Sequence, residues 1–317
     1  MSMLVEVVLF TFISVCVLEK KQEAIEQQTI NQELEMVDYC NINSDKMYKP
    51  VVAVIDTSYN VEEVRKGEIW ENDRELNNNF DDDENGFVDD LNGWNFNNNT
   101  NCIETTQICS HGTVMLNFID DYNLKIMLIT VLDDEGSGET SAIIDAIKYA
   151  ENNGADICNL SFTTYEDNKE LQDIIHQSKM LFIIAAGNTG EELKHENVCY
   201  PACYKENNII TVAACDEDYN IIEDSNYGEE YVDIVAPGQN ITIQLANGYT
   251  TQVSGTSVAT ALVTRVVALV YSQIEYNFNP KEIKQLILET VTKKDNLNGR
   301  VASSGIISMR GALKYLN

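Results

Sequence analysis

The sequence predicts an α/β protein in which a parallel sheet is flanked by helices on both faces, giving a three-layer sandwich. Strand-like runs of apolar residues alternate with stretches of helical period, and this alternation is typical of a parallel sheet. The runs are apolar at nearly every position and rich in β-branched residues, as expected of strands buried on both faces. At 317 residues the chain is long enough to give such a fold a complete core.

Six runs are expected to form the sheet. In chain order they are residues 51–55, 125–132, 157–162, 180–186, 209–214 and 232–236. Residues 241–253 predict a hairpin, because Asn247-Gly248 supplies the two residues that a tight β-turn needs.

The expected helices alternate with these strands and then follow them. Residues 141–152 and 168–177 have helical periodicity, as do 257–274 and 280–291 near the end of the chain. Pro280 opens the last of these at its first helical position. No Gly/Ser/Pro-rich linker and no repeat follows residue 49, so we expect one folded domain over 49–317 after an N-terminal segment, 1–48.

The charge of the chain bears on its partners. It carries 51 acidic and 21 basic residues, a formal net charge of −30. This charge would repel a phosphate backbone, so the sequence argues against nucleic-acid binding. It is compatible with a basic peptide substrate, with a cation-rich environment, or simply with a well-solvated surface, which is the default interpretation.

Three polar side chains stand at the ends of expected elements. Asp56 ends the strand 51–55, at the sheet edge where α/β proteins place their ligands. His111 lies at a turn that opens a short apolar helix. Ser257 lies on a Gly-Thr turn at the start of a long apolar helix, where its backbone N–H and the positive helix end are available to an anion. Alone, small residues at a helix start more often serve only as a helix cap.

Asp56, His111 and Ser257 follow one of the chain orders in which the Ser-His-Asp triad recurs. With all three local motifs present, the chain resembles the subtilisin-like serine proteases (subtilases). The resemblance covers roughly Lys49 to the C-terminus and implies a subtilisin-like three-layer sandwich with a catalytic domain at 49–317. Further similar segments are Asn159-Leu160-Ser161-Phe162, Tyr200-Pro201-Ala202, Ser225-Asn226-Tyr227-Gly228 and Ala236-Pro237-Gly238.

The resemblance implies a role for each site residue. Ser257 would attack a peptide carbonyl, His111 would take and return the proton, and Asp56 would orient the imidazole. Asn188 would complete the oxyanion hole, although a turn asparagine before Thr189-Gly190 is the simpler reading of the residues alone. Two segments would flank an extended substrate strand: Leu160, Ser161 and Phe162, and Ala185, Ala186 and Gly187. This chemistry requires no cofactor.

The chain departs from the family pattern at three places. Ser58 stands where the aspartate motif usually continues with glycine, and Ala261 replaces a proline four residues past the nucleophile. Arg265 replaces a glycine within a helix that is apolar nearly all round. Because a buried arginine needs a carboxylate partner, we expect an acidic neighbour or a kink that exposes Arg265.

An acidic insert between the aspartate and histidine motifs resembles the first nine positions of an EF-hand-type calcium loop. The candidate ligands are Asp81, Asp83, Asn85, Asp89 and the Phe87 carbonyl. Position twelve is Asn92 rather than a bidentate glutamate, so calcium affinity should be lower than a full loop gives. The alternative is an acidic surface turn around Asn85-Gly86.

The N-terminal segment contains an apolar run, Leu4–Leu18, that Glu6 interrupts and that Lys20 and Lys21 follow. The run is short for a transmembrane helix and lacks the positive start of a signal peptide, although it could associate with a membrane. Residues 19–49 are too few for the long folding propeptide of many secreted subtilases. A cytoplasmic or membrane-tethered location is therefore favoured over secretion.

Six of the eight cysteines fall into two groups, and Cys16 and Cys40 lie in the N-terminal segment. Cys158 and Cys215 lie in expected strands and should be buried free thiols. The loop pairs Cys102/Cys109 and Cys199/Cys203 could form local disulfides in an oxidising compartment. Their spacing does not match a zinc site, so none is expected.

The sequence therefore predicts a serine endopeptidase acting on peptides or proteins, with a leader-peptide or precursor-processing protease as the more specific hypothesis. The alternative is a catalytically silent subtilase-like protein that binds peptides or partners. A serine hydrolase acting on esters is a third reading that the triad permits.

Overall fold

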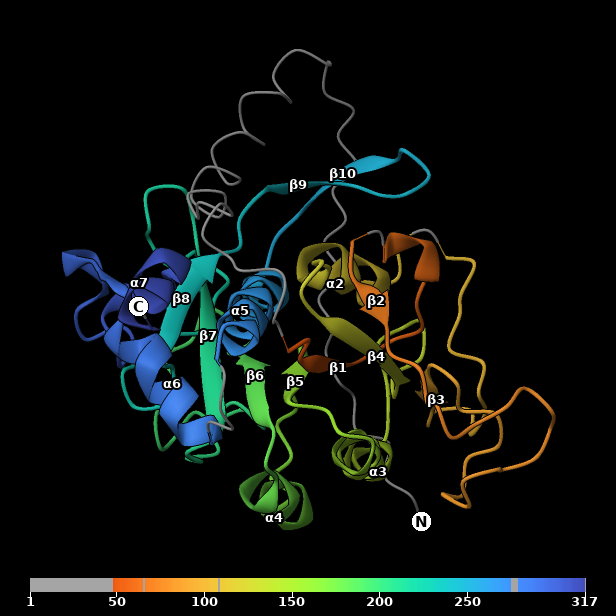
Figure 1. The fold of residues 1–317 in the computed structure, drawn as a ribbon. Coiled ribbons are helices and arrows are strands. Elements are labelled where there is room, and N and C mark those ends of the chain that lie inside the picture. The colour runs from red at the N-terminus through yellow and green to blue at the C-terminus, as the bar shows by residue number, and fades with distance from the viewer. Residues whose placement is uncertain (1–47, 65, 108, 275–278, 317) are drawn as a thin grey trace.

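The computed structural model describes residues 48–64, 66–107, 109–274 and 279–316. Its main sheet has ten strands, which run in space in the order β11-β12-β8-β7-β6-β5-β1-β4-β2, with β3 also paired to β4. Figure 1 shows the part of this sheet from β8 to β2. All pairings are parallel except that of β11 with β12. The strands of the sheet are β1 (Val51–Asp56), β2 (Glu68–Ile69), β3 (Gly93–Asn95), β4 (Lys125–Thr130), β5 (Ile157–Leu160), β6 (Leu181–Ala185), β7 (Ile209–Cys215), β8 (Ile234–Pro237), β11 (Thr292–Lys293) and β12 (Gly305–Ile306).

Six α-helices lie among the described residues, which confirms the predicted α/β class. They are α2 (His111–Ile119), α3 (Thr140–Asn152), α4 (Lys169–Gln177), α5 (Thr256–Ser272), α6 (Pro280–Glu289) and α7 (Met309–Leu316). Two short 3-10 helices, η3 (Val61–Glu63) and η4 (Asp295–Leu297), and the hairpin β9 (Ile241–Gln244) and β10 (Thr250–Val253) complete the fold.

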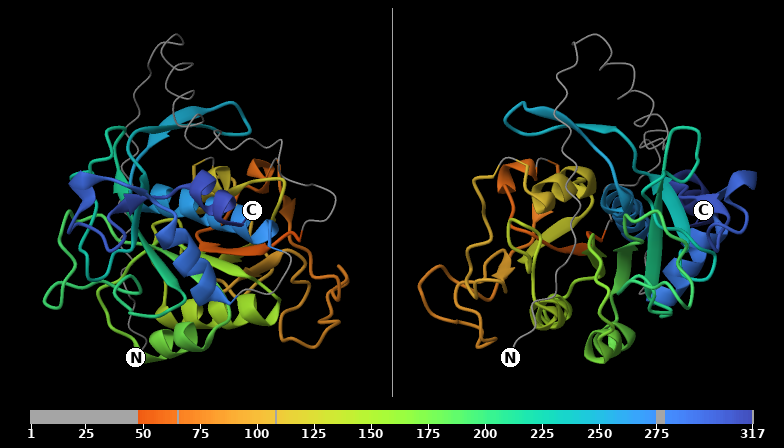
Figure 2. Two further views of the ribbon diagram at one scale, coloured as in Figure 1. Left: turned by 60° about the vertical axis from the view of Figure 1, so that its left-hand side comes forward. Right: turned by 180° about the vertical axis from the view of Figure 1, so that it is seen from behind.

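The alternation of side chains along β1 divides the core into two layers. Val52 and Val54 join the apolar cluster that contains α2 and α5, whereas Ala53 and Ile55 join the cluster that contains α3 and α4. Figures 1 and 2 show α3 and α4 together on one side of the sheet and α5 on the other. The sheet is therefore covered on both faces, as its continuous apolar strands predict.

Helix α5 runs through the middle of the molecule. Every residue of it except Arg265 and Tyr271 is buried. It packs against β5, β6, β7 and β8 on one side and against α2, α6 and α7 on others (Figure 1). The apolar character of this helix on nearly all sides follows from that position.

The observed elements lie within a few residues of the predicted ones, and the hairpin turns at Asn247-Gly248 as expected. Strands β2, β3, β11 and β12 and helix α7 were not predicted. Gly93 shows why β3 is special: its φ is +138°, and a Cβ there would lie 1.7 Å from the Leu128 carbonyl oxygen. Only glycine allows that close approach between β3 and β4.

The remaining expectations concern the N-terminal apolar run and the cysteines. The apolar run Leu4–Leu18 lies outside the described residues. Within the part that the structure does describe, no helix is long and apolar enough to cross a membrane. As expected, Cys158 and Cys215 are buried and form no disulfide. The two loop pairs, Cys102/Cys109 and Cys199/Cys203, are free thiols as well rather than disulfides.

Candidate active site

Asp56 and His111 are joined at the carboxyl end of β1. Both carboxylate oxygens of Asp56 lie close to the Nδ1 atom of His111, at 2.8 and 2.9 Å. Asp56 is fully buried, and the Thr57 amide donates to its Oδ1 at 2.7 Å. The imidazole is thus held through Nδ1, which leaves Nε2 available for proton transfer.

Helix α2 places His111 in this position because it begins there. Ser110 caps the helix by accepting a hydrogen bond from the Thr113 amide, and His111 is the first helical residue. Gly112 lets the helix approach β1: a Cβ there would lie 2.7 Å from both the Thr57 carbonyl oxygen and the Tyr59 ring. The Gly112 amide also donates to Thr57 Oγ1 at 2.9 Å, which fixes the helix start against the strand end.

Ser257 is the second residue of α5, whose first turn follows Gly255 at a φ of +134°. Its hydroxyl is nearly buried and donates to the Ser161 carbonyl oxygen at 2.9 Å. Among the described residues, no hydrogen bond joins Ser257 to His111. Helices α2 and α5 pack side by side in one apolar cluster, so both side chains lie at the starts of neighbouring helices.

Asn188 lies just beyond β6, and its side chain is oriented by Thr256. The Thr256 amide and hydroxyl both donate to Asn188 Oδ1 at 2.9 Å. Because a backbone N–H can only donate, the atom that faces it must be the carbonyl oxygen of the side chain. The described residues provide no partner for Nδ2, so this amide group remains available as a donor.

Thr256 also accepts a hydrogen bond from the Gly187 amide at 3.2 Å, so one side chain links α5 to the segment that carries Asn188. The sequence did not identify Thr256 as a site residue. Its position beside the predicted nucleophile was the only available signal.

The two predicted substrate segments leave neighbouring parallel strands. Leu160 ends β5 and precedes Ser161 and Phe162. Ala185 ends β6 and precedes Ala186 and Gly187. The two segments therefore lie at the same edge of the sheet as Asp56.

Asn226 holds the second of these segments in place and was also not identified from the sequence. Its Nδ2 donates to the Ala186 carbonyl oxygen at 2.9 Å, and its Oδ1 accepts from the Thr189 and Glu191 amides. The Cys199 thiol donates to the same carbonyl at 3.3 Å. A Cβ on Gly187 would lie 2.6 Å from Asn226 Nδ2, so this contact requires glycine.

Of the three departures from the family pattern, the structure explains Arg265, accommodates Ala261, and gives no reason for serine at position 58. The Ser58 carbonyl accepts a hydrogen bond from Ser110 Oγ at 2.8 Å, and Ala261 is buried within an uninterrupted α5. Arg265 has the predicted acidic neighbour: its Nη2 lies 2.9 Å from Asp121 Oδ2. The alternative, a kink that exposes Arg265, is not observed.

The acidic insert brings together only part of the predicted ligand set. Oxygens of Asp81, Asp83 and Glu75 lie within 4.8 Å of one another and could hold a cation. The sequence motif did not include Glu75. The carboxylate of Asp89 instead accepts hydrogen bonds from the Asn78 and Asn79 amides.

The other two predicted ligand residues have contacts of their own. The side chain of Asn85 donates to Asp90 and accepts from the Phe87 amide. The Phe87 ring packs edge-on against Trp94, with ring centroids 5.1 Å apart.

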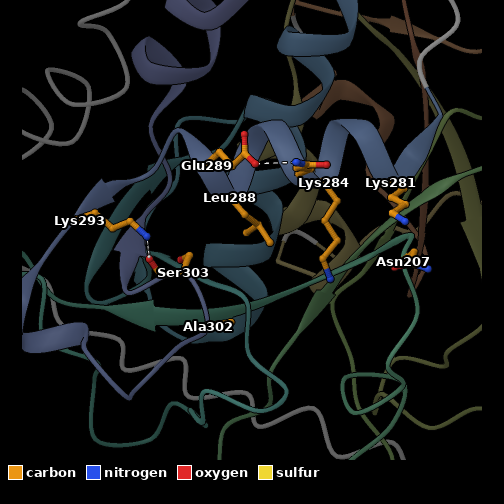
Figure 3. A pocket seen from close by; sticks show the side chains of 9 residues that line it. Asn207, Lys281, Lys284, Leu288, Glu289, Lys293, Ala302 and Ser303 are labelled. Carbon is orange, nitrogen blue, oxygen red and sulfur yellow. Dashed lines mark hydrogen bonds between the residues drawn. The ribbon is translucent and has the colours of Figure 1, made fainter.

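A hollow of about 380 Å³ lies elsewhere in the molecule, between α6 and the segment before β12 (Figure 3). Asn207, which precedes β7, places it toward the amino ends of the strands, whereas Asn188 follows the carboxyl end of β6. Two of its lysines already have partners: Lys284 pairs with Asp233 at 3.1 Å, and Lys293 donates to the Ser303 carbonyl. The hollow is thus separate from the site around Ser257.

The chain is similar to known proteins in sequence and in fold. Residues 48–305 match the family model described as "Subtilase family". The "Thermophilic serine proteinase" of Bacillus sp. (strain AK1) is 34% identical over 196 residues, which is 61% of this chain and 46% of that protein. The "Intracellular serine protease" of Paenibacillus polymyxa is 35% identical over 175 residues, covering 52% of this chain and 53% of the relative. The chain thus spans about half the length of these relatives.

Solved structures share the fold at lower sequence identity. The epidermin leader peptide processing serine protease from Staphylococcus aureus superimposes with a TM-score of 0.71 at 21% identity, covering 96% of this chain and 84% of that one. A structure described as a lanthipeptide protease gives a TM-score of 0.72 at 20% identity, covering 93% and 96%. These similarities confirm the predicted three-layer architecture.

Proposed function

The chain belongs to the subtilase family, and on that basis we propose that it is a serine endopeptidase that cleaves peptide bonds through Asp56, His111 and Ser257. The observation that carries this proposal is the contact of the buried Asp56 carboxylate with His111 Nδ1 at 2.8 Å. His111 begins α2, which packs beside α5, the helix that bears Ser257. The peptide or protein substrate supplies the other reactant, and no cofactor takes part.

In the proposed reaction the Ser257 hydroxyl leaves the Ser161 carbonyl and turns to His111 Nε2, which accepts its proton as the oxygen attacks the substrate carbonyl. Asp56 holds Nδ1 protonated and stabilises the imidazolium that forms. His111 then returns the proton to the leaving amine, and water releases the acyl group from Ser257 by the same steps.

The negative charge that develops on the substrate oxygen would be met by two donors. One is Asn188 Nδ2, which the contacts of Thr256 leave unoccupied. The other is the Ser257 backbone N–H at the positive end of α5. Both donors are fixed before substrate arrives, so little reorganisation is needed when the charge forms.

The substrate would bind as an extended strand between the segments that follow β5 and β6. Glycine at position 187, held at a φ of +98°, suits close approach of a second backbone. Backbone contacts of this kind bind peptides, so they favour a peptidase over an esterase.

A more specific role is the removal of leader segments from peptide or protein precursors. The support for it is similarity of fold: two neighbours among the solved structures are described as a leader peptide processing protease and a lanthipeptide protease. At 20% and 21% identity these neighbours share the fold, and the assignment of a precursor substrate to this chain is our proposal.

Labelling with a fluorophosphonate probe tests the proposal, with wild type compared with Ser257→Ala. We expect labelling of the wild type and none of the variant, because the probe reacts with an activated serine. Folded wild-type protein that does not label would support the catalytically silent alternative. A peptide-library digest alongside an ester substrate then distinguishes a peptidase from an ester hydrolase.

A further inference from the structure

Arg265 and Asp121 form an ion pair that is largely shielded from water. The Arg265 side chain is 20% exposed and that of Asp121 only 1%. Two nitrogens of the guanidinium, Nε at 3.2 Å and Nη2 at 2.9 Å, donate to the same carboxylate oxygen. Two hydrogen bonds from one planar group fix orientation as well as distance.

The carboxylate that receives Arg265 is itself held in place. Its other oxygen accepts hydrogen bonds from the Asn123 amide at 3.2 Å and from Asn123 Nδ2 at 3.0 Å. The preceding residue, Asp120, accepts from the amides of Lys66 and Gly67 at 2.8 and 2.7 Å. The turn that follows α2 is therefore fixed, and Arg265 is attached to a rigid point.

The ion pair connects the two segments of the chain that carry His111 and Ser257. Asp121 lies two residues beyond the end of α2, whose first residue is His111, and Arg265 lies eight residues after Ser257 on α5. At 1.5 Å per residue, Arg265 is about 12 Å along the helix from Ser257. The ion pair thus joins the middle of α5 to the turn that follows α2, whereas the acting side chains stand at the starts of the two helices.

Apolar packing alone would fix these helices less strictly. Helices α2 and α5 pack within one apolar cluster that includes Val114, Phe118 and Leu262, and apolar packing is non-directional. A small sliding or rotation of one helix would change the distance between His111 Nε2 and Ser257 Oγ, and proton transfer tolerates little misplacement.

We propose that the Arg265–Asp121 pair is a positioning device that sets His111 relative to Ser257. This inference rests on the proposed function and adds two residues that contact neither substrate nor the reacting atoms. It explains why this chain carries an arginine in an otherwise apolar helix, where the family pattern has a glycine.

The test uses the full chain and a chromogenic peptide substrate, with kcat counted per active site titrated by a fluorophosphonate. Arg265→Lys keeps the charge but lacks the planar fork, so we expect kcat to fall about tenfold while KM changes less than twofold. The rate constant of fluorophosphonate labelling should fall in parallel. The control is Lys148→Gln, which removes a surface ion pair with Asp145 and should leave both rates unchanged.

A second variant covers the case in which Arg265→Lys folds poorly. The double change Arg265→Met with Asp121→Leu replaces the pair by apolar groups and should fold, because buried pairs can be exchanged in this way. We expect it to show a lowered kcat per titrated site despite a normal thermal midpoint.

The outcomes separate the two proposals. Wild-type kcat per titrated site in both variants would overturn the positioning role while leaving the proposed function intact. A wild type with no Ser257-dependent turnover would overturn both.

Discussion

At the scale of single residues, the side chain of Asn188 is oriented before any substrate binds. Its Oδ1 receives two hydrogen bonds from Thr256, at 2.9 Å each, and its Nδ2 is thereby directed elsewhere. The proposed role of Asn188 as an oxyanion donor therefore depends on Thr256, which has no part of its own in the proposed chemistry.

A substitution pair tests this arrangement. Asn188→Ala removes the proposed donor, and kcat should fall about 10²–10³-fold with little change in KM. Thr256→Ser retains the hydroxyl and serves as the matched control, with kcat close to wild type. Steady-state kinetics on a peptide substrate measures both. An Asn188→Ala enzyme with the wild-type kcat would remove Asn188 from the mechanism.

The sequence reveals a site residue only where a short motif around that residue marks it. Asp56, His111 and Ser257 each stand at the end of an element with its own motif, and the structure brings Asp56 and His111 into contact. Asn226 acts on Ala186 across 40 residues through one side-chain amide. No periodicity or spacing within a window reveals such a contact.

At the scale of elements, short strands and loop conformation escaped the sequence analysis. Strands β2, β11 and β12 have two residues each, too few to show an alternating pattern. The acidic insert was recognised by its spacing, but the loop folds so that Glu75, which precedes the motif, joins Asp81 and Asp83. Spacing within a motif gives no information about a residue contributed from outside it.

The acidic loop gives a prediction about stability. Three carboxylates within 4.8 Å repel one another, so a divalent cation that binds them should stabilise the folded state. We expect calcium to raise the unfolding midpoint of Ser257→Ala protein, chosen to avoid self-digestion, by about 5 °C over a chelator.

Asp81→Asn should abolish this difference, while the control Asp145→Asn, an exposed acid on α3, should preserve it. Equal midpoints with calcium and with chelator in the unmodified loop would dismiss the cation site.

At the scale of the whole molecule, the parallel sheet gathers residues that are far apart in the chain at one edge. Regular alternation of strands and helices was enough to predict this architecture, because parallel strands need helical crossovers. The antiparallel return of β11 and β12 was not predicted, and it extends the sheet beyond β8.

Buried carboxyl groups and the excess of acidic residues together predict how the stability of the fold depends on pH. Burial raises the pKa of Asp233, partly opposed by Lys284, and burial likewise raises the pKa of Asp156 and of Asp90. Each group binds its proton more readily in the folded state than unfolded, so its contribution to stability is present at low pH and is lost as pH rises through the folded-state pKa. Weaker repulsion among the remaining carboxylates acts in the same direction.

Thermal unfolding of Ser257→Ala protein should therefore show a midpoint that rises as pH is lowered from neutral through the raised pKa values of these carboxyls. Asp233→Asn should flatten this dependence, and Glu166→Gln, a change at an exposed carboxyl, should not. A midpoint that falls steadily over the same range would contradict the predicted sign.

The placement of α5 late in the chain has a consequence during synthesis. Asp56 and His111 are made early, and Ser257 follows Asp56 by 201 residues. At about 5–20 residues per second, a ribosome needs roughly 10–40 s to pass from one to the other. Once His111 has been made, the nascent chain holds the proposed base and the carboxylate that orients it, without the nucleophile and without the central helix that completes the core. A nascent chain therefore cannot perform the proposed cleavage on neighbouring nascent chains until translation has passed α5.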